Sequence, residues 1–218
     1  MKTAVMMCAL FLGAIAPARA ETPEKAVCIV CATNGETEPE KVGATRDYQG
    51  TTYYFCSTKC AATFDANPAA YVLETGPAPA ASWTTTAGEP LTLASMGGQV
   101  VLLDFWATWC KPCVKSMPEL DAMYRDYQKQ GLMVVGVSVD QGEDRAKKVK
   151  KFLEKKPVAY PIVIDSAESS SWEAFNVSAL PTLYLIDREG HIVERWIGLV
   201  DMAAVRSAVD RAIGTPAK

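Results

Sequence analysis

Short apolar runs alternate with amphipathic stretches over most of the chain. In the longer, C-terminal part the apolar runs predict buried strands at residues 100–105, 133–139, 160–164 and 182–186. Apolar positions at helical spacing predict helices at residues 114–130, 146–153, 169–175 and 201–213. A turn at 187–190 and a final strand at 191–197 complete the pattern. Strands that alternate with helices favour an α/β fold, with a mixed sheet that carries helices on both faces.

The N-terminal part is smaller and has a different pattern. Residues 51–55 indicate a strand, and residues 60–73 have helix-like spacing. A Pro- and Ala-rich stretch without periodic apolar positions follows at 76–82. We therefore expect a small α+β module over residues 21–75, a linker, and a larger domain over residues 83–218.

Residues 1–20 have the pattern of a secretory signal peptide. Lys2 precedes an apolar run at 4–16, and an Ala-Arg-Ala cleavage site follows at 18–20. The run is shorter than the roughly 20 apolar residues that cross a bilayer. We expect cleavage after Ala20, export to an oxidising compartment and no stable membrane insertion. An uncleaved N-terminal anchor is the alternative.

Composition and charge reduce the range of candidate functions. The chain has 218 residues, 49% of them hydrophobic, with 22 basic and 25 acidic side chains and a net charge of −3. This balance does not favour a nucleic-acid partner. Of the seven cysteines, Cys8 lies in the signal and the other six form two groups. In an oxidising compartment each group is a candidate structural disulfide, metal site or redox couple.

Cys110 and Cys113 lie in the sequence Phe-Trp-Ala-Thr-Trp-Cys-Lys-Pro-Cys at 105–113. A strand, a tight turn and then a helix place Cys110 at or just before a helix N-terminus. Unpaired backbone N–H groups and the helix dipole there favour a thiolate. Cys113 lies about one turn further on, within reach of a disulfide with Cys110. This pattern favours a redox pair over half of a zinc site or a structural disulfide.

These residues, with Met-Pro-Glu-Leu at 117–120 and Ala-Leu-Pro-Thr at 179–182, resemble the TlpA/ResA-like oxidoreductases of the bacterial envelope. The resemblance implies a thioredoxin-like fold and thiol–disulfide oxidoreductase activity. It implies that Cys110 is the attacking, partly exposed thiolate and that Cys113 is the resolving thiol. It also implies that Pro181 is cis and faces them.

In the same resemblance, Asp104 is a buried acid that takes the proton of Cys113. A polar residue at the edge of the strand is the alternative. Many relatives carry a Glu three residues after the second cysteine, where this chain has Ser116. Because serine does not accept a proton near neutral pH, we expect Asp104 to be the nearby acceptor.

The resemblance implies partners and a location as well. They are a disulfide-bearing exported protein, such as apocytochrome c or a copper-site protein, and a membrane thiol donor of the DsbD type, in the periplasm. No cofactor is expected at the redox site. Peroxidase activity is a further possibility, but the cysteines lack a peroxiredoxin-like Thr-x-x-Cys context.

The second group is Cys28, Cys31, Cys56 and Cys60, two close pairs about 25 positions apart. Four thiolates in this arrangement suit a tetrahedral metal site of the zinc-ribbon or treble-clef kind, for Zn²⁺ or Cu(I). Two disulfides are the alternative. If the cysteines bind a metal, a second function follows: a heavy-metal chaperone or sensor whose thioredoxin domain keeps the thiols reduced.

Residues 53–71 resemble the YHS/TRASH modules, which are small metal-binding domains. The resemblance rests on Tyr-Tyr-Phe-Cys-Ser-Thr-Lys-Cys at 53–60, a Phe at 64 and Asn-Pro-Ala-Ala-Tyr at 67–71. It implies a hydrophobic centre formed by Tyr54, Phe55, Phe64 and Tyr71. This chain departs from the usual single first cysteine, because it has two.

Overall fold

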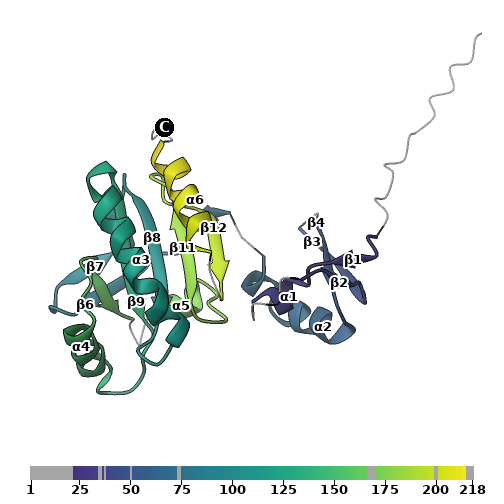
Figure 1. Ribbon diagram of the computed structural model, residues 1–218, viewed down its shortest axis with the longest axis horizontal. Coiled ribbons are helices and arrows are strands. Elements are labelled where there is room, and N and C mark those ends of the chain that lie inside the picture. The colour runs from purple at the N-terminus through teal and green to yellow at the C-terminus, as the bar shows by residue number, and fades with distance from the viewer. Residues whose placement is uncertain are drawn as a thin grey trace, which may run out of the picture.

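The computed structural model describes residues 22–33, 36, 38–49, 51–72, 75–165, 170–198 and 201–214. The expected signal peptide lies outside these residues. Within them, no helix is both long enough and apolar enough to cross a membrane. Figure 1 shows a large α/β part and, beside it, a smaller N-terminal part.

An eight-stranded mixed sheet forms the centre of the α/β part. Its strands, in spatial order, are β5 (Gly76–Pro77), β12 (His191–Ile197), β11 (Thr182–Ile186), β8 (Val100–Trp106), β9 (Leu132–Ser138), β10 (Ile162–Ile164), β6 (Ser82–Thr85) and β7 (Pro90–Thr92). The neighbours β8, β9 and β10 are parallel, whereas the other pairings are antiparallel. The predicted mixed sheet is confirmed.

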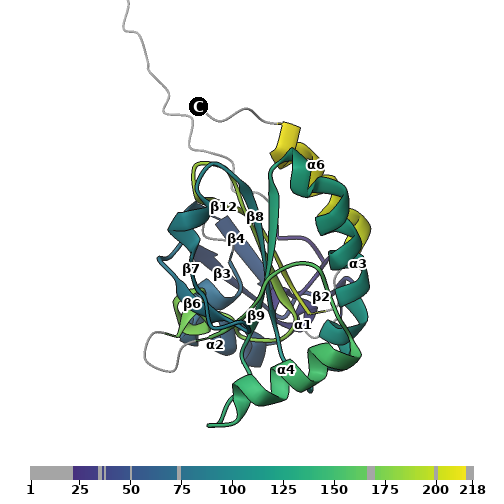
Figure 2. The same ribbon diagram turned by 90° about the vertical axis from the view of Figure 1, so that its left-hand side faces the viewer.

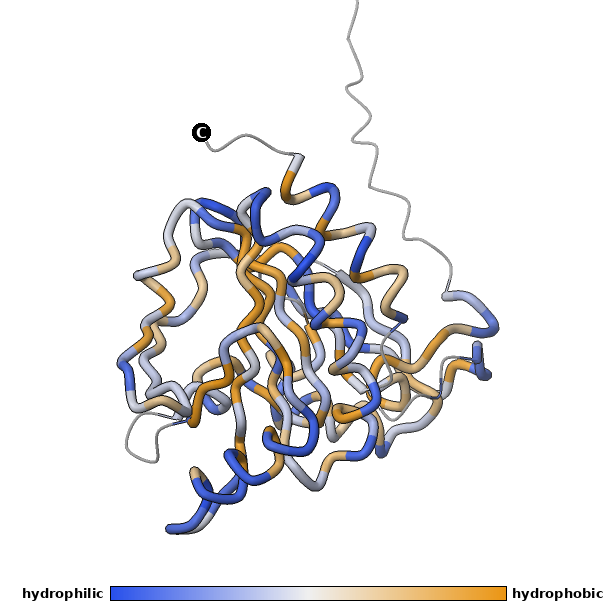
Figure 3. The backbone as a smooth tube through the Cα atoms, turned by 60° about the vertical axis from the view of Figure 1, so that its left-hand side comes forward, coloured by the Kyte–Doolittle hydropathy of each residue, from blue (hydrophilic) through white to orange (hydrophobic). Residues whose placement is uncertain are grey.

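Helices α3 (Lys111–Tyr127) and α6 (Met202–Gly214) lie side by side on one face of this sheet (Figure 2). The short α5 (Ser171–Ala174) belongs to the opposite face, where Phe175 packs on Phe105 with ring centroids 5.5 Å apart. The remaining helix, α4 (Arg145–Lys155), contributes Phe152, which packs on Trp106. All seven residues of β8 are buried, and Figure 3 shows the hydrophobic residues gathered in the interior and the hydrophilic ones on the outside.

Strands β5, β6 and β7 were not anticipated from the apolar pattern. They are short outer strands, and among them Trp83 is the one buried aromatic residue. Its indole N–H donates to the Ser171 hydroxyl at 2.8 Å. Outer strands of this kind are polar because they cover little of the core, so they lack the signature of a buried strand. Gly76–Pro77, expected in the linker, pairs with β12 instead.

The N-terminal module has two small sheets and two helices. Its elements are β1 (Lys25–Ala26), α1 (Ile29–Ala32), β2 (Glu40–Lys41), β3 (Ala44–Tyr48), β4 (Thr51–Phe55), α2 (Thr58–Ala66) and a 3₁₀ turn at Pro68–Ala70. Helix α2 begins at Thr58, with Ser57 as its N-cap, and ends before the expected residue 73. It ends early because Pro68 disfavours a helical conformation at the residue before it.

Phe55 and Phe64 form the buried centre of this module, as expected. The expectation for Tyr54 is wrong, because Tyr53 packs against Phe64 in its place, with centroids 5.4 Å apart. Side chains alternate across a strand, so Tyr53 shares the inner face of β4 with Phe55, and Tyr54 points to the other face. Tyr71 packs on Phe64 as expected.

Among the described residues, the module contacts the larger part at Arg195 on β12 and at Gly198, directly after β12. The Arg195 guanidinium donates to the Ala69 carbonyl at 2.8 Å. Gly198 lies so close to the end of α1 that a Cβ there would be 2.6 Å from the Thr33 carbonyl oxygen. The Gly198 N–H also donates to the Pro181 carbonyl at 2.8 Å. One end of the module is therefore held beside the loop that carries Pro181.

Candidate functional site: a capped cysteine pair and a four-cysteine cluster

The position of Cys110 follows from two local elements. Strand β8 ends at Trp106, and α3 begins at Lys111 with Cys110 as its N-cap. The Cys110 Sγ accepts a hydrogen bond from the Cys113 backbone N–H at 3.3 Å. Pro112 fits the first turn because it has no N–H to satisfy. Cys110 and Cys113 are joined by a disulfide, with their Cα atoms 5.3 Å apart.

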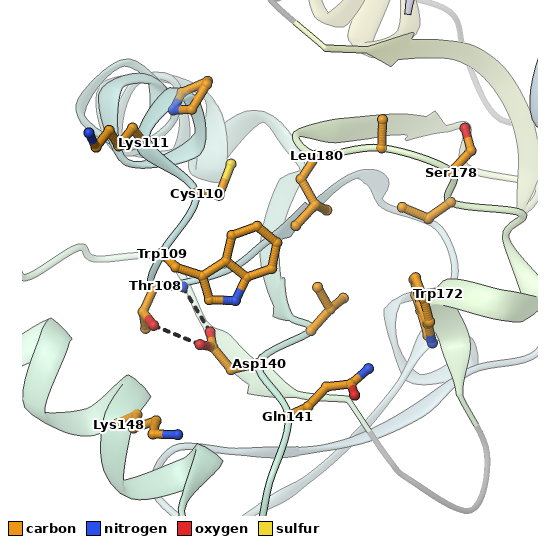
Figure 4. Close-up of a pocket in the computed structure, with 14 residues that line it drawn as sticks. Thr108, Trp109, Cys110, Lys111, Asp140, Gln141, Lys148, Trp172, Ser178 and Leu180 are labelled. Carbon is orange, nitrogen blue, oxygen red and sulfur yellow. Dashed lines mark hydrogen bonds between the residues drawn. The ribbon is translucent and has the colours of Figure 1, made fainter. Parts of the chain in front are cut away.

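Cys110 is less exposed than expected. In this oxidised form it keeps 5% of its surface exposed, and Cys113 keeps none. Cys110 lies in the wall of a groove of about 1040 Å³. The groove also includes Trp109, Lys111, Lys148, Trp172 and residues 177–180. Figure 4 shows the Trp109 indole beside Cys110, and 68% of its surface is exposed.

The loop before β11 forms the opposite wall of this groove. The Leu180–Pro181 peptide bond is cis. Ala179 and Leu180 line the groove, and Leu180 faces the Cys110 side in Figure 4. Pro181 itself is not among the lining residues, although it anchors the loop. A chain segment in the groove would therefore lie between Cys110 and the backbone of this loop.

Asp140 supports the turn that carries the cysteines, a role that the motifs did not suggest. It is buried, and its carboxylate accepts from the Thr108 N–H at 2.8 Å and the Thr108 hydroxyl at 2.6 Å (Figure 4). The Ser138 hydroxyl donates to it at 3.0 Å. A polar Ser-Val-Asp sequence at the end of an apolar strand was the available signal, because parallel strands place such residues at the sheet edge that carries the site.

Asp104 lies within β8 and is fully buried. Neither of its carboxylate oxygens has a hydrogen-bond partner among the described residues. Burial raises its pKa from 3.8 to about 7, because charge is disfavoured away from water. The alternative of a strand-edge polar residue is therefore wrong. Ser116 instead donates its hydroxyl to the Cys113 carbonyl at 2.9 Å.

The cysteines of the N-terminal module converge as well. The thiols of Cys28, Cys31, Cys56 and Cys60 all lie within 4.8 Å of one another, and none is in a disulfide. Three Sγ–Sγ distances are 3.5, 3.6 and 3.7 Å. A tetrahedral Zn²⁺ with bonds of about 2.3 Å separates its sulfurs by about 3.8 Å. The donor set therefore fits a single soft metal ion. Burial, with the neighbouring thiols, raises the pKa of Cys31.

Comparison with known proteins agrees with this geometry. The model of the AhpC/TSA family matches residues 75–195, more than half of the chain. The chain belongs to the AhpC/TSA family. The model of the YHS domain matches residues 36–75. Both predicted resemblances, to thioredoxin-fold oxidoreductases and to YHS modules, are confirmed.

Individual relatives of this chain have names that refer to thiol–disulfide chemistry or to thioredoxin. The thiol-disulfide oxidoreductase ResA of Geobacillus kaustophilus is 40% identical over 109 residues, which are 50% of this chain and 60% of ResA. The thioredoxin-like protein YneN of Bacillus subtilis is 34% identical over 133 residues, 61% of this chain and 76% of YneN. The chain thus spans less than two thirds of the first ResA relatives, at 60% to 64% of their length.

The fold of this chain is also similar to that of a solved structure. The thiol:disulfide interchange protein of the thioredoxin family from Chlorobium tepidum aligns with a TM-score of 0.57 and 27% identity. The alignment covers 66% of this chain and 99% of that one. The thioredoxin-like fold that was expected from the sequence is confirmed.

The raised pKa of Asp104 predicts how stability depends on pH. The unfolded chain releases this proton near pH 3.8, but the folded chain keeps it until about pH 7. Stability is therefore lost as the pH rises through this window, by roughly 4 kcal/mol relative to Asp104→Asn. Urea unfolding of both oxidised proteins between pH 4 and pH 8 measures the difference. If the free energies of unfolding of the two proteins changed with pH in the same way, the pKa of Asp104 would not be raised by folding, which would contradict the prediction.

Proposed function

We propose that this protein is a thiol–disulfide oxidoreductase that reduces disulfides in exported proteins through Cys110 and Cys113. The observation that carries the proposal is the disulfide at the start of α3, in the wall of a groove bounded by the Leu180–Pro181 loop. The names of the ResA relatives support it. A helix N-terminus stabilises a thiolate at Cys110, and the groove gives room for a substrate chain.

The reaction has two exchange steps. The Cys110 thiolate attacks one sulfur of the substrate disulfide, so that a mixed disulfide forms and the other substrate sulfur leaves as a thiolate. Cys113 then loses its proton to Asp104 and attacks the Cys110 sulfur. The second substrate sulfur leaves as a thiolate, and the enzyme disulfide forms again. The two substrate thiolates become thiols by taking one proton from Asp104 and one from water. Asp104 suits this proton transfer because its pKa of about 7 lies near neutral pH.

The proposal extends to location and partners. Removal of residues 1–20 would release the enzyme in the periplasm, where a membrane donor of the DsbD type would return Cys110 and Cys113 to the dithiol. The substrates we propose are apocytochrome c and copper-site proteins, because both need free thiols before they receive their metal group. The signal-like pattern of the first 20 residues and the ResA likeness support this part.

Replacement of each cysteine tests the two steps separately. Cys110→Ser should lower insulin-disulfide reduction to the uncatalysed rate, because the attacking sulfur is lost. Cys113→Ser should still attack, and it should accumulate a covalent mixed disulfide that non-reducing electrophoresis and mass spectrometry detect. An active Cys110→Ser variant, or no adduct with Cys113→Ser, would contradict the proposal. Cys28→Ser, outside the pair, is the control.

The four-cysteine cluster favours a second function, the binding of a soft metal ion for transfer or sensing. Cys28, Cys31, Cys56 and Cys60 would hold the ion, and a bound ion would also link α1, β4 and α2 in a module too small for a large core. The redox pair would keep these thiols reduced. This reading is supported by Gly198, which contacts both Thr33 at the end of α1 and the Pro181 loop.

Metal content tests this second function. After anaerobic reduction the chain should bind about one Zn²⁺ or Cu(I), measured by elemental analysis and by release with a thiol reagent. Cys56→Ser should lose this metal because three thiolates bind more weakly than four. Cys110→Ser should match the unsubstituted chain without oxygen and load less metal in air. Recovery of two stable disulfides and no releasable metal would rule out the function.

A further inference from the structure

Four buried side-chain nitrogen and oxygen atoms have no hydrogen-bond partner in the part of the chain that the structure describes. They are both carboxylate oxygens of Asp104, the Trp106 indole nitrogen and the Tyr160 hydroxyl oxygen. Asp104 and Trp106 are two residues apart on β8, so their side chains point to the same face of the sheet. Unpaired buried polar groups are rare in proteins. Among the described residues, all the unpaired buried side-chain groups belong to these three residues.

Gly136 brings the three side chains together. It lies on β9 as the direct Cα partner of Asp104 on β8. A Cβ at Gly136 would be 3.1 Å from a ring carbon of Tyr160 and 3.2 Å from the Trp106 indole nitrogen. Both rings therefore rest on the strand backbone beside Asp104. We call Asp104, Trp106 and Tyr160 the buried polar cluster.

The helix that carries Cys113 also positions Tyr160. Asp121 on α3 accepts a hydrogen bond from the backbone N–H of Ala159, the residue before Tyr160. Tyr124, one turn further along α3, packs edge-on against the Tyr160 ring at 6.5 Å. On the sheet side, the Gly136 N–H donates to the Pro161 carbonyl at 2.9 Å. Tyr160 is therefore fixed between the redox helix and the strand beside Asp104.

The hydrogen-bonding groups of the cluster are complementary. Tyr160 and Trp106 each offer one donor, and the Asp104 carboxylate offers only acceptors. A single internal water can accept from both donors and donate to the carboxylate, which matches the two to four partners typical of a buried water. The three side chains together thus supply the donors and acceptors that one such water uses.

We propose that Tyr160 is a positioning residue for Asp104: with Trp106 it stabilises the Asp104 carboxylate through an internal water. The inference rests on the proposed function in one respect, because the carboxylate matters for turnover only if it takes the proton of Cys113. Tyr160 thereby sets the pH at which Asp104 becomes a proton acceptor.

The titration of Tyr160 does not interfere with this role. Burial, followed by the charges of Asp104 and Asp121, raises its pKa well above 10, so Tyr160 stays a donor at physiological pH. Two titratable groups of α3 lie next to the cluster: Asp121, which accepts from the Ala159 N–H, and Tyr124, which packs on the Tyr160 ring. The strand neighbours of Asp104, Gly136 on β9 and Leu183 on β11, carry no charge, and α4 contributes the apolar Phe152 against Trp106.

Tyr160→Phe tests the proposal, because it keeps the ring and removes only the hydroxyl. Loss of a donor destabilises the ionised carboxylate, so the Asp104 pKa should rise by about one unit. Carboxyl ¹³C NMR of the oxidised protein measures it directly. The acidic limb of the rate profile for insulin reduction should move to higher pH by the same amount. Tyr124→Phe, which removes a hydroxyl from the adjacent ring, is the matched control and should leave both unchanged.

The same substitution in the Asp104→Asn variant distinguishes a hydrogen-bonding role of Tyr160 from an effect on packing. In Asp104→Asn the further change Tyr160→Phe should not move the rate profile, whereas a packing defect would still alter it. An unchanged Asp104 titration in Tyr160→Phe would overturn the proposal. If that variant does not fold, a high-resolution crystal structure of the unsubstituted chain decides: no water within hydrogen-bond distance of the Tyr160 hydroxyl and the Asp104 carboxylate would overturn it. The titration is read without turnover, so failed insulin reduction by the unsubstituted chain would refute the proposed function alone.

Discussion

The burial of strand β8 is the constraint on which the site depends. All seven of its residues are inside the molecule, so the position of the strand is fixed by packing on both faces. The chain leaves this strand through a short turn held by Asp140 and enters α3 at once. Cys110 is therefore placed at the helix N-terminus by the core itself, and its sulfur accepts the Cys113 N–H that the helix leaves unpaired.

The same burial creates the second chemical feature, a carboxyl group inside an apolar layer. Asp104 costs stability when it is charged, and for that reason its proton affinity lies in the range that a thiol exchange uses. Tyr160 and Trp106 belong to the same layer, and their unpaired donors are the groups that we propose stabilise the Asp104 carboxylate through a water. Packing and acid–base chemistry are thus two consequences of one arrangement around β8.

The sequence predicted the features that depend on local pattern. A largely apolar strand, two cysteines and a helix form a contiguous signal, which predicted Cys110 at the helix N-terminus and within disulfide distance of Cys113, where the structure places it. Tyr160, Asp140 and the outer strands β5 to β7 depend on pairing between distant segments, which the apolar pattern does not report. The assignment of Tyr54 to the core of the module was an avoidable error, because alternation along β4 favours Tyr53. The exposure of Cys110 also depends on a distant segment, the loop that forms the other wall of the groove.

The central claim is that the start of α3 holds the Cys110 sulfur as a reactive thiolate. The most direct test is the rate of alkylation of Cys110 in the reduced chain as a function of pH, followed by mass spectrometry of the labelled peptide. The account predicts a midpoint well below about 8.5, the value of a free cysteine. A midpoint at or above that value, with Cys110 no more reactive than an unstructured thiol, would contradict it.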